Sequence, residues 1–193
     1  CENEGICPDM MCLSKGITAG YMALGATMVT DEIYNTFLGE AAEYKTFYHG
    51  HSYTGNPLAC AAGVAGLELF EKDDVIENLP PKMAEHIQKM NTMKYVGNAR
   101  QCGMLAGIEL MHDKNLKIPF DSTLLMAGGI CQTARKYGLI VRNIGDVIIF
   151  MPPLVSTVQQ IEEMLSILEQ AMQEVFEKVD LHSNIKFSDP CAF

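Results

Sequence analysis

The spacing of apolar and polar residues along this chain predicts an α/β piece followed by an α+β lobe. Short apolar or β-branched runs predict strands over residues 10–13, 21–30, 95–96, 104–111, 139–142 and 147–151. Helical periodicity and start signals predict helices from Asp31, over 56–70, within 72–91, over 124–137 and from Thr157 onward. Residues 39–55 carry polar and aromatic side chains without a period, and we expect a loop there.

Local signals support the helix boundaries. Asn56 can cap a helix and Pro57 suits its first turn, because its missing N–H is not needed there. Thr157 and Gln160 have the spacing of a capping box. Gly138 is a good stop for the helix before it. After the capping box, a core stripe is predicted at Ile161, Leu165, Leu168, Met172 and Val175.

The pattern changes after residue 72, where we expect a boundary. Leu79, Met83, Ile87 and Met90 fall on one helical face, but Pro80-Pro81 must break or restart that helix. We interpret this helical region as the connection to a second lobe. The predicted organisation is a first domain over 1–72, a small α+β domain over 73–180 and a loose tail over 181–193.

Composition excludes several classes of function. The chain has 193 residues and a net charge of −10, which repels nucleic acid and anionic membranes. No apolar run reaches the roughly 18–20 residues of a membrane span. Seven cysteines without a Cys-x-x-Cys pair indicate thiols in a reducing compartment, and we expect a cytoplasmic protein. The chain begins with Cys1, which indicates a fragment or a processed chain.

Lys15 carries the strongest chemical signal. It follows an apolar run and precedes Gly16, so we expect it at the end of a buried strand, beside backbone that a ligand can approach. Most lysines are solvated surface charges, which is the ordinary interpretation. Burial favours the neutral form of an amine, however, and a neutral amine can form an imine.

The loop before Asn56 allows three interpretations. His49 and His51 could bind zinc, but no further ligands stand at a recognisable spacing, and we expect no metal. Ser52 and Thr54 offer hydroxyls beside a helix start whose N–H groups would be free, an arrangement that suits phosphate. The third interpretation is an ordinary glycine-containing loop.

Arg142 follows a predicted strand and precedes a turn that contains Gly145. A single arginine in that position is usually structural or exposed. If it faces a cleft, its guanidinium fits a carboxylate.

Blocks of sequence in the same order resemble the class-III branch of the fold-type I aminotransferases, which use pyridoxal phosphate. The blocks are Pro8-Asp9, Ser14-Lys15-Gly16, 49–62, 138–146 and 150–154. The resemblance covers nearly the whole chain and implies an α/β fold. Residues 1–72 would be the end of a large mixed-sheet domain, and the α+β lobe its C-terminal domain. Within the family, the loop 49–56 and the block 142–146 are most similar to the branch that aminates 8-amino-7-oxononanoate in biotin synthesis.

The resemblance also implies roles for single residues. Lys15 would hold pyridoxal phosphate and move a proton, and Ser52 would bind its phosphate across a homodimer interface. Thr54 could take the place of Ser52. Arg142 would bind the carboxylate of the keto acceptor, with Gly50 and Tyr21 also at the substrate. The partners would be a small-molecule amino donor, either S-adenosylmethionine or lysine, and a keto acceptor.

Two departures and one absence bear on the resemblance. Ser52 and Ala19 stand where the family more often has threonine and glycine. The family's aspartate for the pyridine nitrogen lies before Cys1, so we expect these 193 residues alone to be inactive and to expose apolar surface. Two alternatives stay open: a class-III enzyme for ornithine, 4-aminobutyrate or a diamine, and an inactive binding or dimerisation module.

Overall fold

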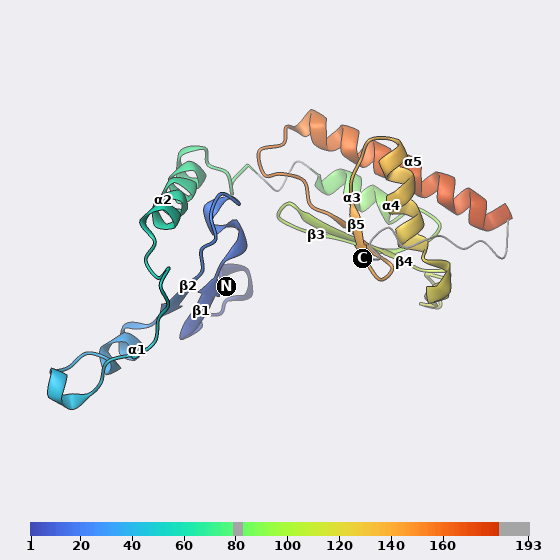
Figure 1. The fold of residues 1–193 in the computed structure, drawn as a ribbon. Coiled ribbons are helices and arrows are strands. Elements are labelled where there is room, and N and C mark those ends of the chain that lie inside the picture. The colour runs from blue at the N-terminus through green and yellow to red at the C-terminus, as the bar shows by residue number, and fades with distance from the viewer. Residues whose placement is uncertain (79–82, 182–193) are drawn as a thin grey trace. The chain divides into compact units, whose positions relative to one another are not determined.

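The computed structural model describes residues 1–78 and 83–181. The chain divides into two compact units, Cys1–Asp73 and Asp74–Phe193. Figure 1 shows the elements of both units.

The first unit combines a small sheet with short helices. Its strands pair antiparallel, with Met10 opposite Val29 and Leu13 opposite Ala26. The elements are η1 (Glu2–Glu4), β1 (Met10–Leu13), η2 (Lys15–Thr18), β2 (Ala26–Val29), α1 (Asp31–Thr36), η3 (Ala41–Glu43) and α2 (Pro57–Lys72).

A side-chain cap marks the start of both α-helices of this unit. Thr30 caps α1 by accepting a hydrogen bond from the Ile33 N–H at 3.5 Å. Asn56 caps α2, as predicted, and accepts from the N–H groups of Leu58 and Ala59 at 3.0 and 3.1 Å. Such a cap stabilises a helix by about 1 kcal/mol.

The strand predicted over 21–30 is wrong in its first half, because β2 begins only at Ala26. The Thr18 hydroxyl accepts a hydrogen bond from the Met22 N–H and donates one to the Met22 carbonyl. Both backbone groups of Met22 are therefore bonded within a turn instead of to a neighbouring strand.

Almost nothing is buried in the first unit. Its only buried described residues are Thr18, Ala59 and Gly63. The buried strand expected before Lys15 is also wrong here: Met10 and Leu13 are exposed and Met11 is half-buried. An all-apolar strand of this kind is typical of a sheet covered on both faces, and the described residues of this unit do not supply that cover.

The second unit is an antiparallel sheet of four strands in the order β3-β4-β6-β5. Figure 1 shows its helices gathered on one side of the sheet. The elements are α3 (Ala84–Met90), β3 (Val96–Cys102), β4 (Leu105–Leu110), η5 (Ser122–Leu124), α4 (Met126–Lys136), β5 (Arg142–Ile144), β6 (Val147–Phe150) and α5 (Val158–Leu181).

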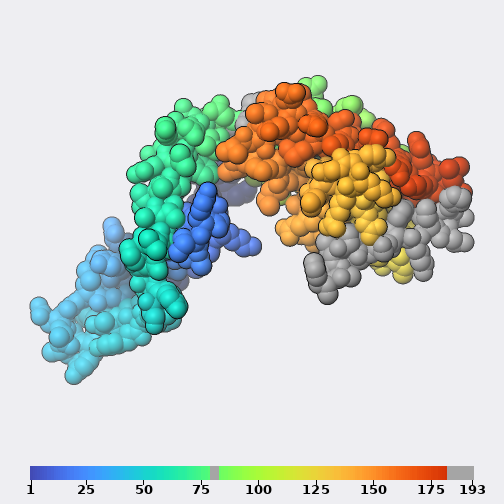
Figure 2. All heavy atoms as spheres, turned by 45° about the horizontal axis from the view of Figure 1, so that its top comes forward, coloured from blue at the N-terminus to red at the C-terminus, as the bar shows by residue number. Residues whose placement is uncertain are grey.

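The core of this unit lies between the sheet and the helices. Alternate residues of the central strands are buried, including Ala106, Ile108 and Leu110 of β4. The stripe predicted on α5 is confirmed, because its five residues are all fully buried. Figure 2 shows the atoms of α4 and α5 packed side by side. The predicted capping box is present, with Thr157 and Gln160 bonded reciprocally.

Two predicted elements of this unit differ from the structure. The helix predicted within 72–91 is only α3, whose face Met83, Ile87 and Met90 is buried as predicted. Leu79 and Pro80-Pro81 lie outside the described residues, as does the predicted tail after Leu181.

The strand predicted over 139–142 begins only at Arg142. Gly138 ends α4 with a φ of 91°, as expected of a C-terminal stop. The Leu139 N–H still bonds the Ala134 carbonyl at 3.0 Å. The backbone of these residues therefore belongs to the C-terminal cap of α4, although their apolar side chains predict a strand.

The hairpin of β5 and β6 closes onto the start of α4. The residue before α4, Leu125, provides no side-chain cap. The Asp146 carboxylate, in the hairpin turn, accepts a hydrogen bond from the Ala127 N–H instead. Burial raises the pKa of the Asp146 carboxyl above its usual value, and the bond from Ala127 only partly offsets this. A tertiary contact thus supplies the cap that the local sequence lacks.

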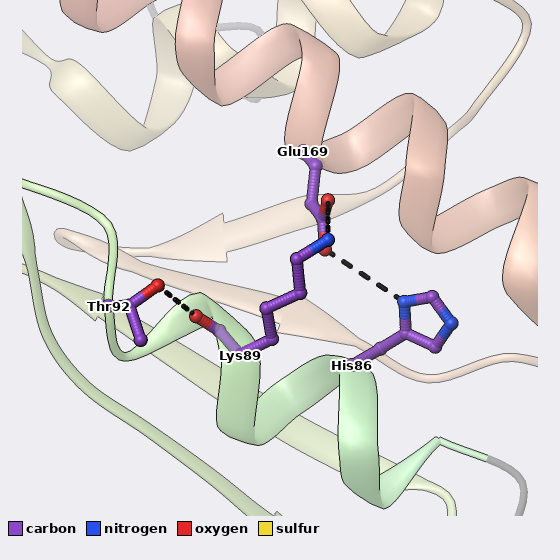
Figure 3. A network of polar contacts seen from close by, with 4 residues as sticks. All are labelled: His86, Lys89, Thr92 and Glu169. Carbon is purple, nitrogen blue, oxygen red and sulfur yellow. Dashed lines mark hydrogen bonds and ion pairs between the residues drawn. The ribbon is translucent and has the colours of Figure 1, made fainter.

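A polar network joins α3 to α5 (Figure 3). Glu169 of α5 lies 3.5 Å from the Lys89 ammonium and 3.9 Å from Nδ1 of His86. The Lys89 carbonyl accepts a hydrogen bond from the Thr92 hydroxyl at the end of α3.

No helix within the described ranges is long and apolar enough to cross a membrane.

Truncating one core position tests the packing of the second unit. Leu168→Ala removes a fully buried side chain of α5. We expect it to lower the free energy of unfolding by about 2–5 kcal/mol, measured by chemical denaturation. Leu181→Ala on the same helix is the matched control, because Leu181 is 76% exposed. Equal losses from both variants would contradict the core described above.

The pH dependence of stability tests the Asp146 contact. Because the pKa of Asp146 is raised, the folded protein binds the proton of this carboxyl more tightly than the unfolded chain does. The free energy of unfolding therefore falls as pH rises from the ordinary pKa of 3.8 through the raised pKa of the folded protein. We expect Asp146→Asn to lack this fall, so that its stability relative to the wild type increases across that window. Chemical denaturation at a series of pH values measures the difference.

Asp180 provides a control of opposite sign. Hydrogen bonds from Lys94 and Tyr95 lower the pKa of Asp180, so its contribution to stability is lost as pH falls. Asp180→Asn should therefore lose stability relative to the wild type as pH rises. The same direction for both variants would show that the Asp146 assignment is wrong.

Candidate functional site

Lys15 lies in a strained turn. It follows β1 directly and opens η2, with a left-handed φ of 52°. For a residue other than glycine this conformation costs about 1–2 kcal/mol. Ala19, at the end of the same turn, also has a left-handed φ, of 50°. Strain of this kind collects at functional sites, where the surrounding structure holds it in place.

The Lys15 turn forms one wall of an open cavity of about 770 Å³. The opposite wall comes from the end of the 48–55 loop and the first turn of α2. The side chain of Lys15 is exposed, and its amine makes no ion pair with any described residue. The lining residues are Ser14, Lys15, 22–25, His51, 53–56 and Ala59. The cavity therefore brings together an unpaired amine, three hydroxyl-bearing residues (Ser14, Tyr53 and Thr54) and a helix start.

The 48–55 loop contributes Thr54 to this cavity but not Ser52. The Thr54 hydroxyl accepts a hydrogen bond from the His51 N–H at 3.2 Å, which leaves its own proton free to donate. Ser52 is exposed and lies off the lining. Of the two hydroxyls singled out in the sequence, Thr54 shares a cavity with the lysine of its own chain.

The free N–H groups expected at the start of α2 are not free. Pro57 has none, and Asn56 Oδ1 accepts those of Leu58 and Ala59. The next N–H, of Cys60, bonds the Asn56 carbonyl. The cap that starts the helix therefore uses the donors that an anion would need, and only the positive end of the helix dipole remains.

A zinc site at His49 and His51 gains no support. Nδ1 of His51 already accepts the Tyr53 N–H at 3.2 Å. The ring of His49 lies 5.4 Å from that of Phe47, in a tilted arrangement. Within residues 1–78 and 83–181, no group of three or more metal-binding side chains occurs.

The other residues singled out lie apart from the lining. Tyr21 is 85% exposed, just beyond the Lys15 turn, and donates its N–H to the Thr18 carbonyl. Gly50 lies in the loop, with the Thr54 hydroxyl 4.0 Å from where a β-carbon would stand. We did not predict a role for Thr18 from the sequence. The only signal for it there is its place in a run of small residues.

Arg142 lines a separate cavity in the second unit, of about 310 Å³. This cavity lies between the end of α4, the hairpin strands and the segment 151–153, and its walls are mostly apolar. The guanidinium of Arg142 forms no ion pair with the described residues, and Arg135 is the only other charged group in the lining. A cation beside apolar walls can bind an acid that carries a hydrocarbon chain.

The chain matches known proteins over nearly its whole length. The family model Aminotransferase class-III matches residues 1–172. The adenosylmethionine-8-amino-7-oxononanoate aminotransferase of Geobacter sulfurreducens is 46% identical over 178 residues, covering 91% of this chain and 39% of the relative.

Solved structures agree. The crystal structure of the adenosylmethionine-8-amino-7-oxononanoate aminotransferase of Methanocaldococcus jannaschii matches with a TM-score of 0.80 and 44% identity, over 86% of this chain and 39% of that one. An amine transaminase from an uncultivated Pseudomonas species, solved in its PLP-bound form, matches with a TM-score of 0.81 and 34% identity, over 90% and 40% of the two chains.

The chain spans about two fifths of the length of these relatives. Within that length, the family match begins at the first residue and includes the Lys15 turn, the 48–55 loop and the Arg142 hairpin. The chain belongs to the class-III aminotransferase family.

Proposed function

We propose that this chain is part of a pyridoxal-phosphate-dependent aminotransferase that converts 8-amino-7-oxononanoate to 7,8-diaminononanoate in biotin synthesis. One observation carries the proposal: Lys15 is held in a left-handed turn on the wall of a cavity, with an unpaired amine. The curated relatives at 42–46% identity bear the name of that activity. S-adenosylmethionine, which their names include, is the proposed amino donor.

The two units take the roles of two domains. On this proposal residues 1–72 are the C-terminal portion of the cofactor-binding large domain. Residues 73–180 form the small C-terminal domain. The exposure of β1 supports the first assignment, because an all-apolar strand is typical of a sheet covered on both faces. Without that cover, the 193 residues alone are inactive on this proposal.

The residues of the Lys15 cavity fit pyridoxal phosphate. The cavity offers an amine for its aldehyde and the Thr54 hydroxyl for its phosphate, and Gly55 lets the backbone approach. When bound, the cofactor supplies an electrophilic carbon and an electron sink. Lys15 Nζ would hold it covalently and, once released, carry a proton to and from the substrate carbon.

Ser52 supports a homodimer within this proposal. It is exposed and lies off the cavity of its own chain, as a residue that binds the phosphate of a second copy would. Thr54 would then bind the phosphate from within the chain. The described cysteines are thiols and not disulfides, which fits a reducing compartment and supports a cytoplasmic enzyme.

Arg142 would bind the acceptor's carboxylate. Its apolar cavity suits the hydrocarbon chain of 8-amino-7-oxononanoate, and its unpaired guanidinium suits the acid at the end of that chain. Gly50 and Tyr21 would contact substrate from the loop and from the far end of the Lys15 turn.

Two alternatives remain. The amine transaminase from the uncultivated Pseudomonas species matches at 34% identity with a TM-score of 0.81, and an aminotransferase from Vibrio fluvialis matches with a TM-score of 0.87 at 28% identity. A different class-III activity is therefore the second candidate. The third is a binding or dimerisation module, which the sparse burial of the first unit favours.

Borohydride reduction tests the role of Lys15. The intact protein is mixed with pyridoxal phosphate, reduced and digested, and the modified peptide is identified by mass spectrometry. We expect the label on Lys15. Lys15→Ala should lower activity by about 10²–10⁴-fold or more, because it removes both the attachment point and the proton carrier. Lys45→Ala, which removes an exposed lysine of the same unit, is the control. A label elsewhere would remove the central assignment.

Amino-acceptor profiling tests the substrate. We expect the intact protein to aminate 8-amino-7-oxononanoate with S-adenosylmethionine in preference to lysine. Strong activity with 2-oxoglutarate and none with 8-amino-7-oxononanoate would favour the second candidate. Failure to bind the cofactor at all would favour the third.

Two substitutions test Arg142 in the same assay. Arg142→Leu should raise KM for the acceptor about tenfold or more, because it removes a charged hydrogen-bond donor, and Arg142→Lys should raise it less. Arg135→Lys is the matched control on the same cavity. An unchanged KM in Arg142→Leu would remove the proposed carboxylate contact.

A further inference from the structure

Thr18 is buried, although almost no other residue of the first unit is. Its exposed fraction is 1%. Among the described residues 1–73, it is the only buried residue with a polar side chain. It closes η2, three residues after Lys15.

The Thr18 hydroxyl makes two bonds to one residue. Oγ1 accepts from the Met22 N–H at 3.3 Å and donates to the Met22 carbonyl at 2.5 Å. The loop between them is strained at Ala19, which has a left-handed φ of 50°, whereas Gly20 adopts its φ of 84° without strain. The hydroxyl therefore closes a loop that the backbone alone would not favour.

The residues around Thr18 connect the loop 18–22 to the Lys15 cavity. Met22 and Leu24 line the cavity, and the Ser14 hydroxyl bonds the Leu24 carbonyl at 3.0 Å from the other side of Lys15. Helix α2 packs against the same turn. A β-carbon on Gly63 would stand 3.2 Å from the Leu24 side chain and 3.6 Å from the Ile17 carbonyl.

We propose that Thr18 is a positioning residue for Lys15. Its hydroxyl fixes the loop from 18 to 22, which holds the left-handed backbone at Lys15 on one side and the 22–24 wall of the cavity on the other. Without the hydroxyl, the loop opens and Lys15 relaxes toward an ordinary backbone conformation. This role rests on the proposed function, in which Lys15 binds the cofactor.

Two substitutions at Thr18 separate the hydroxyl from the shape of the side chain. Thr18→Val keeps the branched shape and removes both bonds, whereas Thr18→Ser keeps the hydroxyl. Gly20→Ala strains the same loop without a new contact, because nothing lies within 4 Å of the added β-carbon. Gly5→Ala is the matched control: Gly5 also has a positive φ, of 62°, with nothing near its β-carbon, and it does not line the cavity.

Two measurements on the intact protein report on the proposal. Hydrogen exchange of the Met22 amide in the cofactor-free protein reports opening of the loop. The rate at which pyridoxal phosphate attaches to Lys15, followed by its visible absorbance and trapped with borohydride, reports the position of the amine. Thermal unfolding midpoints measure general destabilisation.

We expect Thr18→Val to accelerate Met22 exchange and to slow attachment to Lys15, each by about fivefold or more, because one hydrogen bond corresponds to a factor of about five and the variant loses two. Gly20→Ala should change both rates in the same directions. Thr18→Ser should restore rates near those of the wild type, and Gly5→Ala should lower only the unfolding midpoint.

Attachment at the wild-type rate in Thr18→Val, with only the unfolding midpoint lowered, would overturn the positioning role. If Thr18→Val does not fold, an unchanged attachment rate in Gly20→Ala would overturn it instead. A wild-type protein that never attaches the cofactor would reject the proposed function and this role together. Attachment at equal rates in wild type and Thr18→Val rejects the role of Thr18 alone.

Discussion

The close approach of helix α2 to the turn after Lys15 is the contact on which the candidate site depends. Thr18, Ala59 and Gly63 are the buried residues of the first unit, and all three belong to this turn or to α2. A β-carbon on Gly63 would crowd the Leu24 side chain at 3.2 Å and would stand at ordinary contact distance, 3.6 Å, from the Ile17 carbonyl. Gly63 and Gly66 thus lower the helix propensity of α2 and allow close packing against the strained turn that presents Lys15.

The two units differ in how they are stabilised. The second has a continuous core between its sheet and its helices, formed by apolar residues of every strand but β5 and of all three helices. The first has a largely exposed strand pair, of which β1 is all apolar, and exposed side chains such as Leu58 and Leu67 along α2. The chemistry proposed for Lys15 is therefore carried by the unit with the least burial of its own. That contrast fits a chain that spans about two fifths of its relatives' length.

Much of the fold could be predicted from the sequence, because local signals decide helix ends and periodicity decides buried faces. Asn56-Pro57, the Thr157 capping box and the α5 stripe were all predicted and confirmed. The predictions failed where side chains or caps compete for backbone groups. Thr18 bonds the backbone of Met22, and the α4 cap extends to Leu139, so both predicted strands begin late. The site residues were found through their resemblance to a family, and their roles stay predictions.

The sequence by itself determined the element types, the core stripes and the family, because these depend on residue identity and spacing along the chain. Only the tertiary structure decided which groups are available to a ligand. It showed that Asn56 uses the N–H groups at the start of α2 and that Thr54 shares a cavity with Lys15. It also showed that Asp146 caps a helix far from it in sequence. Hydrogen-bond partners and left-handed backbone depend on contacts between distant segments, which no local pattern of residues encodes.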